Sequence, residues 1–384
     1  MLSFGVMSRL ATTGEVLQLI RTGEAVTRAD LGRVTGLSRP AVVHRVTELL
    51  QRGLVVEDAE GPSTGGRPPV RLRFNTAGGF VPVASLGASR TQIAVCDLSG
   101  AILDRTEVVI DVEEGPGVVL PLVMDTWDKL LYGRAPVVGV GLGVPATVEF
   151  AAGRTESARV MASWTGVEIP PLIAARFPVP VLVDNDVNVI AMGEHRAAYA
   201  AELGDLLFVK VSTRIGAGVI SSGSILRGAL GAAGEIGHIP VRDGGGVLCR
   251  CGNTDCVDSL ASGTAILRDL RAKGRDVHTL ADVTALVRAG DAETMAVVRQ
   301  AGRHLGEVIS GAVNLLNPAV VVLGGDVAEM FQPLVSGVRE VVYRRSTQLA
   351  TRTLRIERTR LGPAAGLTGS ALLVTDHILS PEAI

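Results

Sequence analysis

Three of the four cysteines in this chain lie within eight residues, Cys249 to Cys256, and a histidine, His238, precedes them closely. Cysteine thiolates and a histidine nitrogen can together close a tetrahedron around a structural Zn²⁺, which needs four such ligands. The pattern therefore predicts one zinc ion in a glycine-rich loop, held by His238, Cys249, Cys251 and Cys256. Ordinary buried cysteines, or one disulfide, are the alternative interpretation.

Composition narrows the class of the protein. The 384 residues suffice for two or three domains, and apolar residues and glycine are abundant while aromatic residues make up only 3%, as in many α/β proteins. No segment has the length and apolarity of a membrane span, and the first ten residues lack a signal-peptide pattern. Thiols at metal spacing suit a reducing compartment, so we expect a cytoplasmic protein with no membrane contact. The net charge of −2 hides an asymmetry, because residues 1–75 hold ten arginines against seven acidic residues.

The first 76 residues predict a winged helix-turn-helix domain. Apolar positions between residues 13 and 20 recur at helical spacing. Thr27 can cap a second helix, and Ser38 can cap a third. Two short helices joined by a tight turn that contains Gly36 are typical of a helix-turn-helix.

Beyond the third helix, residues 53–56 and 70–74 predict two strands around a turn-rich segment, which together would form a wing. The second helix of a helix-turn-helix enters the major groove, and an arginine at the tip of a wing can enter a narrow minor groove. We therefore predict double-stranded DNA as a partner, contacted by Ser38, Arg39, Val43, His44, Thr47 and Arg67. A small helical domain that binds a protein is the alternative.

The larger C-terminal part repeats an α/β pattern. Apolar strands are predicted at 81–84, 91–97, 102–110 and 137–144, and again at 205–212, 216–221, 239–242 and 320–323. Helical segments are predicted at 117–131, 263–273, 279–289 and 291–316. Two similar halves suggest a ligand-binding cleft between them.

Three motifs carry a resemblance to a known family: residues 231–238 with the cysteines that follow, residues 183–188, and Asn317-Pro318 with residues 323–325. On these motifs the chain resembles the ROK family, which groups bacterial sugar-responsive repressors with sugar kinases on an actin-like ATPase fold. The winged helix resembles the repressor branch, which includes xylose, N-acetylglucosamine and glucose-responsive repressors, because the kinases lack it. The resemblance implies an α/β protein with a winged helix-turn-helix at 1–76 and two actin-like lobes at 77–185 and 186–363, residues 364–384 packing back on the first lobe.

The resemblance also implies which residues line a sugar pocket: Asn185, Asp186, Glu235 and His238, and Asp258 where the family commonly has glutamate. His238 would bind the metal through one ring nitrogen and leave the other near the sugar. Asp258 could instead be an exposed carboxylate that caps a helix.

The chain departs from the family's pattern in the two segments that bind the ATP phosphates in the family's kinases. The family's kinases carry Asp-x-Gly-Gly-Thr where this chain has Ser85 to Ser89, and a glycine where it has Arg214. Asp186 matches the catalytic base of the kinases, but it would be vestigial because the lost aspartate and glycines weaken ATP binding. Arg214 would either fill the nucleotide site or point to solvent.

We therefore expect a sugar-responsive repressor of carbohydrate genes and not an enzyme. Its partners would be a pseudo-palindromic DNA operator, a small sugar effector and further copies of the chain, in a dimer or tetramer. The alternatives are an ATP-dependent sugar kinase that retains a DNA-binding domain, and a DNA-binding protein that has lost its sugar site.

Overall fold

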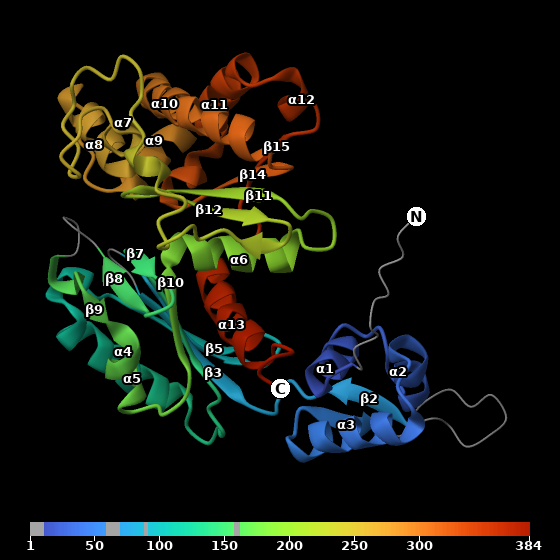
Figure 1. The fold of residues 1–384 in the computed structure, drawn as a ribbon. Helices are drawn as coiled ribbons and strands as arrows, with labels where there is room; N and C mark the ends of the chain where they lie inside the picture. The colour runs from blue at the N-terminus through green and yellow to red at the C-terminus, as the bar shows by residue number, and fades with distance from the viewer. Residues whose placement is uncertain (1–10, 59–69, 88–90, 157–161) are drawn as a thin grey trace.

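The computed structural model describes residues 11–58, 70–87, 91–156 and 162–384. A small helical head at the N-terminal end lies beside a larger body of two α/β lobes (Figure 1). Each lobe contains a five-stranded mixed sheet, and two helices lie between the sheets, α6 (Asp186–Ala198) and α13 (Ala365–Ile378). None of the described helices is long and apolar enough to cross a membrane. The α/β class expected from the sequence is confirmed.

The head has the predicted winged helix-turn-helix arrangement. It contains α1 (Thr13–Arg21), α2 (Arg28–Thr35) and α3 (Arg39–Gln51), followed by the antiparallel strands β1 (Val55–Asp58) and β2 (Arg71–Phe74). Thr27 begins α2 by accepting the backbone N–H of Asp30, and Ser38 begins α3 by accepting that of Ala41. Gly36 ends α2 in the left-handed conformation that glycine adopts without strain. The predicted capping residues therefore set the boundaries of these helices.

The first lobe is built on a sheet with strand order β10-β6-β3-β4-β5. Its strands are β3 (Phe80–Leu86), β4 (Thr91–Asp97), β5 (Ile102–Val108), β6 (Val140–Val144) and β10 (Val181–Asn185). The lobe also holds η1 (Val112–Glu114), α4 (Pro116–Leu130), η2 (Ala162–Trp164), α5 (Ile169–Ala174) and a small sheet of β7 (Thr147–Glu149), β8 (Arg154–Glu156) and β9 (Val167–Glu168). Alternate residues of β3 face opposite sides, so Ala84 and Leu86 share a core with α4, while Val81 and Val83 share one with α13 and the head.

The second lobe has a sheet with strand order β13-β12-β11-β14-β15. Its strands are β11 (Leu206–Val211), β12 (Ile215–Ser221), β13 (Ser224–Ile225), β14 (Val320–Gly324) and β15 (Arg355–Arg358). Its helices are η3 (Ile236–His238), α7 (Val257–Ala261), α8 (Gly263–Ala272), α9 (Leu280–Arg288), α10 (Ala292–Leu316), η4 (Asp326–Met330), α11 (Phe331–Arg345), α12 (Gln348–Thr351) and η5 (Gly362–Ala364). Leu207 and Val209 of β11 face the core that includes α10, while Phe208 faces the core that includes α6.

The strand predicted at residues 239–242 is wrong. Only an isolated bridge joins Pro240 to Cys256, and Pro240 has no backbone N–H to donate to a ladder. The Val241 N–H instead donates to the Asp255 carbonyl. The segment therefore forms one side of the cysteine-containing loop and does not extend a sheet.

Helices α6 and α13 touch backbone to backbone through two glycines. A Cβ added at Gly369 would lie 1.6 Å from the Val189 carbonyl oxygen, and one added at Gly193 would lie 2.1 Å from that of Ala365. No larger residue fits at these crossing points. The pair forms a close-packed unit between the two sheets.

The head has no apolar core separate from the body. Val16 and Leu17 of α1 belong to the same buried cluster as Leu367 of α13 and Leu379 beyond it. The Gln18 side chain also donates a 2.5 Å hydrogen bond to the Leu379 carbonyl. Asp376 of α13 lies 3.5 Å from Arg21 of α1 and 2.7 Å from Arg196 of α6. The three helices are therefore joined by charge pairs as well as by the core.

Candidate functional site

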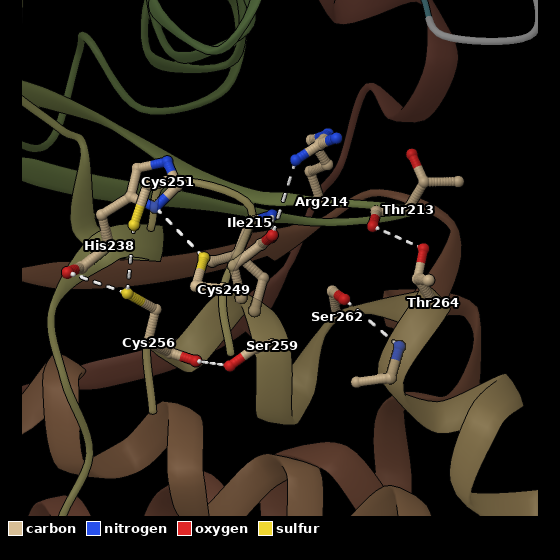
Figure 2. A network of polar contacts seen from close by, with 12 residues as sticks. Thr213, Arg214, Ile215, His238, Cys249, Cys251, Cys256, Ser259, Ser262 and Thr264 are labelled. Atoms are coloured by element: carbon tan, nitrogen blue, oxygen red, sulfur yellow. Dashed lines mark hydrogen bonds and ion pairs between the residues drawn. The ribbon is translucent and has the colours of Figure 1, made fainter. Parts of the chain in front are cut away.

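The predicted metal ligands meet at one point of the second lobe (Figure 2). The ligand atoms of His238, Cys249, Cys251 and Cys256 all lie within 4.8 Å of one another. The Cys249 Sγ is 3.7 Å from the His238 Nδ1, and the Cys251 Sγ is 3.6 Å from the Cys256 Sγ. Zinc–sulfur bonds of about 2.3 Å place sulfurs about 3.8 Å apart in a tetrahedron, so the group can hold such an ion. All four cysteines carry free thiols, which excludes the disulfide alternative in this structure.

The loop around this cluster is held by its own hydrogen bonds. The Asp255 carboxylate accepts the backbone N–H groups of Gly246 and Val247, and the Cys249 N–H donates to the Asn253 carbonyl. A backbone hydrogen bond from Asn253 lowers the pKa of the Cys251 thiol to about 7, whereas burial raises that of Cys256 to about 12. A thiolate, the form that binds metal, is therefore accessible at Cys251 near neutral pH.

Cys96 lies apart from this cluster, fully buried in β4. Burial raises the pKa of its thiol to about 12, so it remains a neutral apolar side chain.

Asn185 and Asp186 lie where β10 ends and α6 begins. The Asn185 Oδ1 caps α6 by accepting the Val187 N–H at 2.8 Å, and its Nδ2 donates to the Ala146 carbonyl at 2.9 Å. The Asp186 carboxylate is almost fully buried and accepts a 2.5 Å hydrogen bond from the Lys210 Nζ of β11. Both predicted sugar-contacting side chains are therefore already engaged by other parts of the protein.

Glu235 and His238 lie at η3 of the second lobe. The Thr147 hydroxyl of the first lobe donates to the Glu235 carboxylate at 2.7 Å, which joins the two lobes directly. The His238 Nδ1 faces Cys249, and its Nε2 lies 4.0 Å from the same carboxylate. This arrangement is the one expected for a histidine between a metal and a sugar, and the sugar contact itself stays a prediction.

Asp258 is buried within α7, and the alternative that it is an exposed helix cap is wrong. Its Oδ1 accepts the Ile215 N–H at 2.8 Å, and its Oδ2 lies 3.7 Å from the Arg214 Nη1 (Figure 2 shows Arg214 and Ile215). Cys256, not Asp258, occupies the N-cap position of α7. Burial raises the pKa of the Asp258 carboxyl.

Of the two orientations expected for Arg214, the structure contradicts the one that points to solvent. Its side chain is 29% exposed and turns toward Asp258, 3.7 Å away. Its Nη2 is buried and has no hydrogen-bond partner among the residues that the structure describes. On the other phosphate-side segment, Ser85 lies in β3, while Ala88 and Ser89 fall outside the described residues.

Sequence reasoning missed a partly buried ion pair between the two lobes. The Arg227 Nε donates to the Asp184 carboxylate at 2.8 Å, and its guanidinium lies 3.8 Å above the centre of the Phe150 ring. Asp184 also accepts hydrogen bonds from the Asn185 N–H and the Asn188 side chain. Nothing in the local sequence around Arg227 indicates this partner, because residue 184 lies in the other lobe.

The predicted DNA contacts on the head lie together on one exposed surface. Ser38 and Arg39 start α3, and Val43, His44 and Thr47 follow on its exposed side; Val43 is 44% exposed. Val42, Val46 and Leu49 on the opposite side are buried in the core of the head. Arg67 at the expected wing tip lies outside the described residues.

Comparison with known proteins identifies the family. A model described as the ROK family matches residues 84–377. The chain belongs to the ROK family. It is 27% identical over 385 residues to a putative xylose repressor from Caldicellulosiruptor sp. (strain Rt8B.4), with 96% of each chain covered. A glucokinase from Halalkalibacterium halodurans is 29% identical and covers 77% of this chain and 95% of its own length.

Among solved structures, this ROK protein is similar to a ROK family transcriptional regulator described as a homolog of the E. coli MLC protein. The two share 24% identity with a TM-score of 0.82, and 96% of each chain is covered. The regulator therefore has the same fold over the head and both lobes. The glucokinase matches only 77% of the chain.

Proposed function

We propose that this protein is a sugar-responsive transcriptional regulator in the cytoplasm that represses genes of carbohydrate uptake and metabolism. The observation that carries the proposal is a head with an exposed α3 surface, packed on a two-lobed body through one shared core. The similarity to a protein named as a xylose repressor, which extends over 96% of both chains, supports the same function.

Operator binding follows from the geometry of the helix-turn-helix. Two copies of the chain in a dimer or tetramer would place two α3 helices in successive major grooves of a pseudo-palindromic site. Ser38, Arg39, Val43, His44 and Thr47 would face the base edges and phosphates, and Arg67 would reach the minor groove.

The effector would be a sugar held in the cleft by Asn185, Asp186, Glu235, His238 and Asp258. A sugar hydroxyl that takes the place of Thr147 at Glu235, or of Lys210 at Asp186, would exchange an internal hydrogen bond of the protein for its own. Such an exchange alters how the lobes are held together. The sugar then shifts the protein between two arrangements by its difference in affinity for them, and the operator-binding geometry is lost in one.

The metal would be one structural Zn²⁺, because one nitrogen and three sulfur ligands within 4.8 Å of one another can fill all four positions of a tetrahedron. It would fix His238 beside Glu235 and so stiffen one wall of the cleft.

A sugar kinase with a DNA-binding head is the second candidate, favoured by the retained Asp186 and the similarity to a glucokinase. The pairing of Asp186 with the Lys210 ammonium argues against it, because the ammonium occupies a carboxylate oxygen to which a sugar hydroxyl would have to give its proton. A coupled assay with Mg²⁺, ATP and a hexose panel tests this candidate. Turnover that Asp186→Asn abolishes would establish it.

The main test is fluorescence anisotropy with the metal-loaded protein and DNA from upstream of its own gene. We expect saturable, salt-sensitive binding that one sugar among glucose, xylose and N-acetylglucosamine weakens. Specific binding that none of these sugars or their phosphates changes would contradict the sugar-responsive part of the proposal. Absence of specific binding would contradict self-regulation and give priority to the kinase assay.

A further inference from the structure

A cavity of about 300 Å³ lies beside the last turns of α6, away from Asn185 and Asp186 at its start. Its walls come from α6, the second half of α13, the hairpin between β12 and β13, and, in the first lobe, β10 and Phe150. None of the predicted sugar-contacting residues lines it. Arg196 at its wall follows Asp186 by ten residues, or about 15 Å along the helix. The cavity is therefore separate from the proposed sugar site.

Much of the wall of this cavity is apolar. Leu372 and Leu373, two consecutive residues of α13, expose only 5% and 4% of their surface. The apolar aliphatic residues of the wall are Leu182, Met192, Ile220, Ile225, Leu372 and Leu373. Sites for small molecules combine such a wall with a few polar groups, and their volumes begin at about 300 Å³. The space therefore suits a small molecule with an apolar body.

The charged residues around the cavity include more arginines than aspartates. Asp376 accepts a 2.7 Å hydrogen bond from Arg196 and also lies 3.5 Å from Arg21 of α1, so two guanidinium groups share one carboxylate. Burial lowers the pKa of Arg21, and repulsion from Arg196 adds to this effect. Arg227, also at the wall, is balanced by Asp184. Among the described residues these three arginines pair with no other carboxylate, which leaves one positive charge in excess.

Arg196 and His377 have donors that a ligand can use. Arg196 has five N–H donors and gives one of them to Asp376, and its side chain is 46% exposed. His377 is exposed, and its ring makes no hydrogen bond among the residues that the structure describes. From this arrangement we infer that the cavity binds a small organic monocarboxylate, whose carboxylate group contacts Arg196 and whose apolar body lies against Leu372 and Leu373.

The charge of the cavity favours a monocarboxylate over other small molecules. One negative charge matches the one positive charge in excess, and a carboxylate can accept two parallel N–H groups from an arginine. A neutral molecule would leave this charge unbalanced, and a cation would be repelled by it. Because Asp376 also pairs with Arg21 of α1, the ligand would bind next to the contact between the head and the body. This inference does not depend on the proposed sugar response.

Isothermal titration calorimetry of the full-length, metal-loaded protein tests the inference with octanoate as the probe. Acetate has the carboxylate without the apolar body, octanol has the apolar body without the charge, and octylamine has the opposite charge. We expect octanoate to bind at least about tenfold more tightly than acetate and octanol, because only octanoate uses both parts of the cavity. Octylamine should not bind.

The Arg196→Gln variant should bind octanoate at least about tenfold more weakly, and Arg196→Lys should keep more of the affinity because it keeps the cation. The matched control is Arg268→Gln. Arg268 of α8 is 47% exposed and pairs with Asp269 at the same 2.7 Å, but it lies outside the cavity, so octanoate affinity should stay unchanged. Melting curves of all variants verify folding.

Four results would overturn the inference. They are no binding of octanoate, octanol or acetate binding as tightly as octanoate, an octanoate affinity unchanged in Arg196→Gln, and an equal loss of affinity in Arg196→Gln and Arg268→Gln. The first would show that the cavity holds no such ligand, and the others would show that Arg196 and the apolar wall do not act together. Each of them would leave the proposed sugar response intact, because the anisotropy test examines that response separately.

Discussion

The α3 surface and the interlobe cleft use their polar side chains in opposite ways. On α3, Arg39, His44 and Thr47 are exposed, and none of their side chains makes a hydrogen bond within the part of the chain that the structure describes. In the cleft, Asp186 is bonded to Lys210 and Glu235 to Thr147. A surface of unengaged side chains, such as the one proposed to bind DNA, can bind without internal rearrangement. Between the lobes, a ligand that takes over these hydrogen bonds would also change contacts within the protein.

Loss of the metal should cause the largest difference between the two regions: sugar binding between the lobes should be lost, and DNA binding by the head should be kept. Cys256→Ser removes a ligand from the cluster that fixes His238, and we expect the metal content measured by elemental analysis to fall from about one ion per chain to almost none. We expect a loss of about 4 kcal/mol of stability, or about 10 °C in Tm by calorimetry, and loss of the sugar response. DNA binding at 20 °C should persist, because the head lies away from the loop.

Cys96→Ala is the control for this change, because Cys96 is the one cysteine outside the cluster. It should keep the metal and the sugar response. Full metal content in Cys256→Ser would refute the assignment of that ligand, and equal loss of DNA and sugar binding would refute the separation of the two regions.

The next largest effect should come from the head. Arg39→Ala should weaken operator binding by roughly tenfold to a hundredfold, because a base-reading arginine contributes about 1–3 kcal/mol. Anisotropy titrations measure it, and sugar affinity should stay the same. Arg33→Ala removes an exposed arginine from α2, where it pairs with Asp30, and should change binding far less. Equal effects of the two substitutions would mean that only net charge matters.

Asn185→Ala tests a side chain that caps α6 and is also predicted to contact the sugar. Loss of the N-cap of α6 should cost about 1 kcal/mol of stability. Thr279→Ala removes the N-cap of α9, outside the cleft, and should cost a similar amount. Only Asn185→Ala should also weaken sugar binding in calorimetric titrations. Unchanged sugar affinity would assign Asn185 a purely structural role.

The smallest expected effect is a change in sugar affinity when the hydrogen bond between Thr147 and Glu235 is removed. Thr147→Val removes the hydrogen bond to Glu235, which a sugar would otherwise have to displace. We expect sugar affinity to rise by about two- to fivefold, since a net hydrogen bond contributes about 0.5–1 kcal/mol. Thr126→Val on α4, where the hydroxyl bonds only within its helix, should have no effect. Weaker sugar binding in Thr147→Val would show that Thr147 assists the sugar directly.

Sequence reasoning succeeded where local signals decide the structure. Thr27 and Ser38 cap the helices that they were expected to cap, and the cysteine spacing led to a real cluster. It failed at residues 239–242, where apolar content resembled a strand but Pro240 cannot donate to a ladder. The three strands of the small sheet in the first lobe are too short to show alternation.

The partners of the cleft residues could not be predicted at all. Lys210 and Asp186 come from different elements, and Thr147 and Glu235 from different lobes. Only the packing of the sheets brings these pairs together, and no spacing of residues in the sequence predicts this packing. The apolar patterns likewise gave no sign that the head and α13 share one core.

The hydrogen bond between Gln18 and the Leu379 carbonyl joins positions 361 residues apart in the chain. A ribosome makes the head first and α13 last of the described helices, and domains generally begin to fold as they emerge. The apolar face of α1 that packs toward α13 must therefore wait for nearly the whole chain before it is covered. Folding thus has a built-in order of assembly, in which one face of α1 stays exposed to solvent until α13 has been made and has packed against it.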